Sequence, residues 1–266
     1  MQGAAHHLET LIPDETAVGF CLIKHGNVPA FRLFSSLESK IISLQKLCTF
    51  DAISIPLLYR PRSPNVCVVR RAKREDASEI VSTLNETLEG RLFAPFYSEE
   101  QLLKTWSSIP GFGPEQFYVA EESGQMKGVL ALWDMDRLHR TLILRYNWRG
   151  QLVRSLFNLS SRFLPLATAL PPVGHSFRSL TALIIAVRDN DPLILRDLLA
   201  FTTADQVGSG YHLIHLGFTS GDPLRVALHH LPTYGFRSDI LLVVRPTHRQ
   251  AVIDTKLPPY IDLSII

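Results

Sequence analysis

The stretch SLTALIIAVRDNDPLILRDLLAFTTADQVGSGYHLIHLGF, residues 179–218, decides the fold. Its first segment, Ser179–Val187, is a continuous apolar run, which predicts a strand buried on both faces. Asp191 and Pro192 then supply an N-cap and a first-turn proline for a helix that ends in glycines. A second strand is predicted at Tyr211–Phe218. The order strand, helix, strand indicates an α/β protein.

The flanking segments extend this pattern into a mixed sheet. Apolar residues four apart, at Ile80, Leu84 and Leu88, predict a helix, and QFYVAEESGQMKGVLALWDMD is typical of a hairpin. The fold class is therefore α/β (α+β mixed sheet). The expected elements are strands at Val66–Arg70, Gln116–Glu121, Met126–Asp134, Arg140–Asn147, Ser179–Val187, Tyr211–Phe218 and Arg237–Arg245, and helices at Asp76–Gly90, Ser98–Trp106, 191–210 and 221–232.

Composition and charge exclude several classes of protein. The 266 residues are 46% hydrophobic and 20% charged, which is typical of a folded chain rather than a disordered one. The net charge of +2 is too small to attract nucleic acid or an anionic membrane. Cys21, Cys48 and Cys67 lack the spacing of a disulfide framework or a zinc site, and we find no secretory signal or transmembrane pattern. We expect a cytoplasmic chain with no metal, no nucleic-acid partner and no membrane partner.

Three stretches carry a resemblance to a known family. They are VRRAKREDASEIV, with Arg70 and Asp76; FYVAEESGQMKGVLAL, with Gly128; and TYGFRSDILLVV, which contains Tyr234. Together with the element order they resemble the GNAT superfamily of N-acyltransferases. The resemblance implies a GNAT-like acyl-CoA N-acyltransferase fold and acetyl-CoA as co-substrate. It also implies a small-molecule amine or a peptide amine as acceptor, and it leaves a homodimer open.

The proline-rich loop LLYRPRSPN, Leu57–Asn65, is the expected domain boundary. Before it, Ala17–Ile23 and Ile53–Tyr59 resemble the last strands of another GNAT unit, and we expect them to pair. Two interpretations stay open: a partial GNAT-like unit, or an unrelated cap on the main sheet. The expected divisions are a first unit at 1–62, a GNAT-like domain at 63–250 with an insert at about 148–179, and a C-terminal tail at 251–266.

The turn after Val187 bears on cofactor binding. In the family, a glycine-rich turn at a helix N-terminus holds the pyrophosphate of acetyl-CoA through backbone N–H groups. Here the turn contains no glycine, and Asp189 and Asp191 place carboxylates where phosphate should bind. Two interpretations stay open: a capped helix with no cofactor, and a degenerate site that still binds CoA. The resemblance assigns the cofactor contacts to Ile185, Val187, Arg188, Asn190 and Leu193.

Four further side chains are candidates for chemistry. The resemblance places Tyr234 where a general acid protonates the leaving thiolate, and His215 is a candidate general base for an amine because its reference pKa is near neutral. Asp134 and Asp136 follow the strand that ends at the family's acceptor pocket, where they would attract a cationic amine. Each has a structural alternative: packing for the histidine and the tyrosine, and an acidic turn for the aspartates.

Two functions from different classes follow. The resemblance implies a GNAT-like acyltransferase that transfers an acyl (acetyl) group from acyl-CoA to an amine. The altered pyrophosphate turn favours instead a non-catalytic GNAT-like domain that has lost CoA binding and acts as a binding or assembly module.

Overall fold

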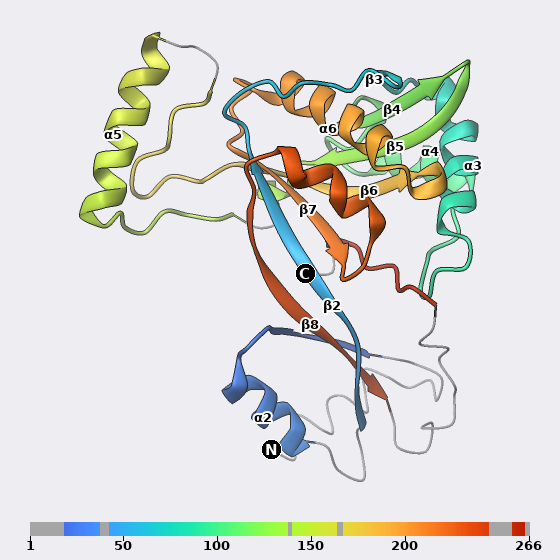
Figure 1. The fold of residues 1–266 in the computed structure, drawn as a ribbon, viewed down its shortest axis with the longest axis horizontal. Helices are drawn as coiled ribbons and strands as arrows, with labels where there is room; N and C mark the ends of the chain where they lie inside the picture. Colours follow the sequence, from blue (N-terminus) through green and yellow to red (C-terminus); the bar gives the residue numbers. More distant parts are fainter. Residues whose placement is uncertain (1–18, 38–42, 138–139, 164–166, 245–256, 264–266) are drawn as a thin grey trace.

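A computed structural model of the chain describes residues 19–37, 43–137, 140–163, 167–244 and 257–263 (Figure 1). Eight strands form one sheet in the order β1-β8-β2-β7-β6-β5-β4-β3, in which only β6 and β7 are parallel neighbours. This confirms the mixed α/β fold class. The strands are β1 (Gly19–Lys24), β2 (Ser43–Pro56), β3 (Val68–Arg71), β4 (Phe117–Glu122), β5 (Gln125–Trp133), β6 (Ser179–Val187), β7 (Leu213–Thr219) and β8 (Tyr234–Val244).

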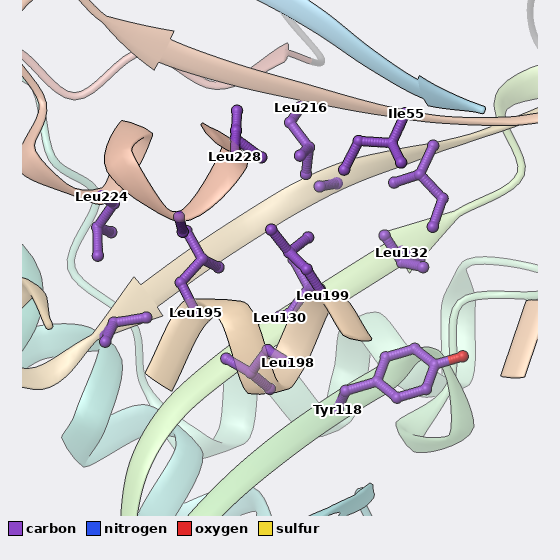
Figure 2. Close-up of a cluster of buried hydrophobic side chains, with 14 of the residues drawn as sticks. Ile55, Tyr118, Leu130, Leu132, Leu195, Leu198, Leu199, Leu216, Leu224 and Leu228 are labelled. Atoms are coloured by element: carbon purple, nitrogen blue, oxygen red, sulfur yellow. The ribbon is translucent and has the colours of Figure 1, made fainter. Parts of the chain in front are cut away.

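Helices cover both faces of the β3–β7 part of the sheet. Alternate residues of β4 show this, because Phe117 and Val119 pack with α3 and α4 whereas Tyr118 packs with α6. Figure 2 shows the second of these clusters, in which leucines of α6 and η5 meet the strand side chains. The α-helices are α2 (Val28–Leu37), α3 (Ala77–Leu88), α4 (Glu99–Ser108), α5 (Trp148–Phe163) and α6 (Pro192–Gln206), and the 3-10 turns are η1 (Arg74–Asp76), η2 (Pro114–Gln116), η3 (Met135–Arg137), η4 (Arg188–Asn190) and η5 (Pro223–His230).

The N-terminal strands belong to the same sheet as the rest of the chain. β2 lies between β7 and β8 and is antiparallel to both, while β1 pairs with β8. The prediction that the segments at Ala17–Ile23 and Ile53–Tyr59 pair with each other is therefore wrong, since β8 lies between them. β2 also starts before the predicted strand, at Ser43. The sequence pattern does not indicate the first part of this strand because polar residues interrupt it. One of them, Asp51, is buried and ion-paired with Arg225 at 2.8 Å.

The loop expected to divide the chain is held against α6 by a buried carboxylate. Asp197 is 1% exposed and accepts hydrogen bonds from the backbone N–H groups of Asn65 (2.9 Å), Val66 (2.7 Å) and Cys67 (2.9 Å). The Ser63 hydroxyl donates to the same carboxylate. These bonds order the chain where it enters β3.

We expect Asp197→Ala to lower the free energy of unfolding by about 3–5 kcal/mol, because three backbone N–H groups and the Ser63 hydroxyl lose a buried, charged acceptor. The matched control is Asp191→Ala in the same helix. It removes a single N-cap bond, to the Leu193 N–H, and should lower the free energy by about 1 kcal/mol. Urea unfolding measures both, and equal losses in the two variants would contradict the anchoring role of Asp197.

The segment between β5 and β6 leaves the sheet as an arm. The strand predicted at Arg140–Asn147 is wrong, because in this segment only Leu142 makes a bridge, an isolated one to Ser176. The physical reason is that β5 and β6 pair with each other and leave no free edge between them. α5 follows and projects away from the sheet (Figure 1). In the part of the chain that the structure describes, no helix is long and apolar enough to cross a membrane.

Candidate functional site

β6 and β7 separate at a defined point. They pair over Ser179–Thr181 and Leu213–His215, with Thr181 opposite His215. Both strands are described in full, and they make no further pairs with each other although β6 continues to Val187 and β7 to Thr219. The two strands therefore diverge beyond Thr181 and His215. We call the space between their diverging halves the wedge.

A row of four side chains crosses the sheet where the wedge begins. Ser54 of β2 lies directly opposite both Tyr234 of β8 and His215 of β7, and His215 lies opposite Thr181 of β6. Directly opposed residues point to the same face of a sheet. The structure thus brings Tyr234 and His215 together. Ser54, which stands between them, was missed from the sequence because only the insertion of β2 places it there.

The two central side chains of the row are hydrogen-bonded. The Ser54 Oγ lies 2.8 Å from His215 Nδ1, and Tyr234 stands directly opposite Ser54 on the neighbouring strand. Burial lowers the pKa of His215, which keeps its imidazole neutral at neutral pH. Burial raises the pKa of Tyr234 and the interaction with Ser54 lowers it to a lesser degree, so the phenol keeps its proton. The row therefore holds a neutral base and a protonated acid on the two sides of Ser54.

The row faces the larger of two cavities beside the wedge. This cavity has a volume of about 690 Å³ and is lined by Ser54, Thr181, His215 and Tyr234, together with residues at the base of the arm. Tyr234 is 53% exposed and so reaches the solvent at the cavity rim. The volume is within the range of small-molecule sites.

The two candidate aspartates have different surroundings. Asp136 lines the cavity, and its carboxylate accepts a hydrogen bond from the Ser176 hydroxyl at 2.7 Å. Asp134 is already paired, with the Arg178 guanidinium at 2.9 Å and the Tyr211 hydroxyl at 2.8 Å. Burial tends to raise the pKa of Asp134, but these two bonds outweigh it and lower the pKa. Of the two, only Asp136 is among the residues that line this cavity.

His212 is turned away from this site. Its ring stacks on Phe177 with centroids 4.6 Å apart, and its Nε2 lies 3.1 Å from the Ala169 carbonyl oxygen. Among the described residues, no group of three His, Cys, Asp or Glu side chains is arranged to hold a metal ion.

The turn after Val187, η4, contains left-handed backbone conformations without glycine. Asp189 and Asn190 have φ values of 57° and 50°, in the left-handed region that glycine adopts most easily. Asp191 is the N-cap of α6, as predicted, and its carboxylate accepts the Leu193 N–H at 2.8 Å. Arg188 is ion-paired with Glu86 at 2.9 Å. The groups expected to hold phosphate therefore have partners within the chain.

Arg91 closes the outer end of the wedge. Its guanidinium donates to the Asn190 Oδ1 at 3.0 Å, just after β6, and lies 3.5 Å from the Asp222 carboxylate, just after β7. A single cation thus bridges the two diverging strands. The other expected cofactor residues differ in position: Ile185 lines the wedge, whereas Val187 is fully buried in the core.

The C-terminal tail occupies the wedge. The Pro258 carbonyl accepts the Leu92 N–H at 3.0 Å, and the Tyr260 N–H donates to the Leu92 carbonyl at 2.8 Å. From there, residues 259–263 line the wedge beside Ala182 and Gly217, and a cavity of only about 40 Å³ remains. Leu263 lines this cavity and also the larger one. The tail therefore follows the wedge from its outer end to the row of four side chains.

Comparison with known proteins supports the fold. No family model and no curated protein matches the sequence. A GCN5-related N-acetyltransferase from Sphaerobacter thermophilus is 14% identical, with a TM-score of 0.52; the match covers 89% of this chain and 63% of that one. Another from Anabaena variabilis is 8% identical over 90% of this chain and 48% of that one, with a TM-score of 0.47. N-myristoyltransferase from Saccharomyces cerevisiae is 9% identical over 85% of this chain and 63% of that one, with a TM-score of 0.43.

The first of these similarities establishes the class of fold. The chain has the fold of the GCN5-related N-acetyltransferases, as the sequence resemblance predicted. It spans 63% of the length of the Sphaerobacter protein. At this identity the similarity concerns the fold alone, so activity has to be argued from the site.

Proposed function

We propose that the chain is an acyltransferase that transfers an acyl group, with acetyl as the simplest case, from acyl-CoA to the amine of a small molecule or a peptide. The observation that carries the proposal is the row of Tyr234, Ser54 and His215 where the wedge begins. It places a neutral base and a protonated acid on the two sides of Ser54, beside a cavity of about 690 Å³. Fold and site support the same class of reaction.

The proposed mechanism gives each residue one role. Asp136 attracts the cationic acceptor, and His215 accepts a proton from its ammonium group. The free amine then attacks the thioester carbonyl carbon; the C–N bond forms and the C–S bond breaks. His215 releases this first proton to solvent and then accepts the second proton, which the nitrogen loses as the amide forms. Tyr234 donates its proton to the leaving thiolate and is reprotonated from His215 by way of the Ser54 hydroxyl. The products are an amide and a free thiol.

A second function is favoured by a specific observation. Arg188, Asn190 and the Leu193 N–H all have partners within the chain, and residues 259–263 fill the wedge. An acyl donor that enters the wedge has to displace this tail. A non-catalytic binding or assembly module would keep it in place permanently.

Calorimetric titration of acetyl-CoA at low salt separates the two functions. We expect binding by the wild type, and about tenfold tighter binding by Asp189→Gly, because glycine removes both a carboxylate and a strained left-handed conformation. Asp189→Asn is the matched control, since it removes only the charge. Weaker binding by Arg188→Ala would support the acyltransferase. If neither the wild type nor Asp189→Gly binds, the module is the better description.

A further inference from the structure

The arm between β5 and β6 has an unusual charge distribution. Residues 140–177 contain five arginines and no lysine. The sequence has no acidic residue anywhere between Asp136 and Asp189. Because the whole chain has a net charge of only +2, the rest of it is net negative. The part that projects from the sheet therefore carries a net positive charge, opposite in sign to that of the rest of the chain (Figure 1).

The inner face of α5 is polar and already satisfied. Asn158 exchanges two hydrogen bonds with the backbone of Leu170, at 2.7 and 3.0 Å. Arg154 donates to the Pro171 carbonyl at 3.1 Å, and the Tyr146 hydroxyl donates to the same oxygen at 2.8 Å. These contacts fix the helix on the segment that returns to β6.

The outer face of α5 is apolar. Trp148 is 73% exposed, and Leu152, Leu156 and Leu159 are 54%, 59% and 54% exposed. The spacing of four, four and three residues places these side chains on one face of the helix, which we call the apolar stripe. A surface helix normally turns such a face toward the core. Here it is turned outward, which marks an interaction site.

The residues around the apolar stripe indicate what covers it. Arg145 and Arg149 are exposed next to its Trp148 end, and Arg149 lies over the Trp148 ring at 5.1 Å. A second copy of the arm would bring like charges together. An anionic bilayer matches both properties, because acyl chains receive the apolar stripe while headgroup phosphates pair with the arginines.

From these observations we infer that α5 lies in the interface of an anionic lipid membrane, with the apolar stripe below the headgroups and Arg145 and Arg149 among them. The helix lies on the membrane rather than across it. Thr141 and Ser179, where the arm joins the sheet, line the large cavity. Binding therefore holds the cavity mouth near the lipid surface. The inference departs from the expectation of no membrane partner, which rested on the net charge.

Co-sedimentation with vesicles tests the inference on the full chain. We expect binding to phosphatidylcholine vesicles that contain about 30% phosphatidylserine at low salt, and weaker binding to pure phosphatidylcholine or at high salt. Leu152→Gln/Leu156→Gln should lower the affinity about tenfold or more. The matched control Gln151→Ala/Ser155→Ala changes neutral polar positions of the same helix and should leave the vesicle affinity within about twofold of the wild-type value. Arg145→Gln/Arg149→Gln should lower it about tenfold.

Fluorescence gives an independent signal. The chain has three tryptophans, of which Trp148 is the exposed one, so its emission should shift to the blue on vesicle binding and the shift should disappear in Trp148→Phe. Absence of wild-type binding to the anionic vesicles overturns the inference. So does equal binding by the wild type and Leu152→Gln/Leu156→Gln. A dimer that this double substitution dissociates, without vesicle binding, would instead show that the apolar stripe joins two copies of the chain.

Discussion

Removal of residues 257–266 is expected to tighten acetyl-CoA binding by about tenfold or more. The tail fills the wedge that an acyl donor would enter, and it is held there by two backbone hydrogen bonds to Leu92. A tethered segment acts as a competitor at high effective concentration. If it is docked in nine-tenths of the molecules or more, the measured affinity is reduced by about tenfold or more. Calorimetric titration of the full chain and of the chain that ends at Lys256 measures the difference.

The control for this truncation is a chain that ends at Leu263, which keeps the residues that line the wedge. It should bind acetyl-CoA as the full chain does. Thermal unfolding of both truncated chains checks that they remain folded. Unchanged affinity in the folded chain that ends at Lys256 would contradict the role of the tail as a competitor. If this chain binds no acetyl-CoA at all, the result contradicts the proposed acyltransferase function.

Elements defined by local pattern could be predicted closely. The apolar run at Ser179–Val187 matches β6 residue for residue, and the cap at Asp191 begins α6 as expected. Both depend on side chains that are near in sequence: an unbroken apolar segment, and a carboxylate next to the N–H groups it caps. The order of β6, α6 and β7 then follows from chain connectivity. This is why the fold class could be predicted without knowledge of the sheet order.

The position of β2 could not be predicted in the same way. Pairing of β2 with β7 and β8 joins residues more than a hundred positions apart, and no local pattern encodes such a partner. Asp51 also interrupts the apolar pattern, because its charge is compensated by arginines from distant segments. Ser54 enters the candidate site only through this insertion, so the sequence indicated Tyr234 and His215 but not the residue that connects them.

Net charge does not show the charge of the arm, for a related reason. The net charge of +2 is the sum of a positive arm and a net negative remainder, so it shows neither of them. The tail was a comparable case: its segment 257–263 is too short to predict a docking site, and its contacts with Leu92 and Gly217 exist only in the folded chain. Site features that depend on long-range packing therefore had to come from the structure.

His215→Gln is expected to slow acetyl transfer by about 10²–10⁴-fold, because the base that deprotonates the acceptor is lost. Release of free thiol from acetyl-CoA, measured with a panel of primary amines, reports the rate. The matched control is His229→Gln on the exposed surface of η5, which should retain the wild-type rate. The wild-type rate should fall only below pH 6.5, because burial lowers the pKa of His215 from 6.5 and the imidazole has to be neutral to act as a base.

The same residue has a second pH dependence, which separates catalysis from packing. With its pKa lowered in the folded chain, His215 binds a proton more tightly when the chain is unfolded. The free energy of unfolding therefore decreases as the pH falls from 6.5 toward the lower folded-state pKa, and this contribution should disappear in His215→Gln. Urea unfolding at several pH values measures it. If His215→Gln removes this dependence but transfers acetyl groups at the wild-type rate, His215 is a packing residue and the base has to be sought elsewhere along the cavity.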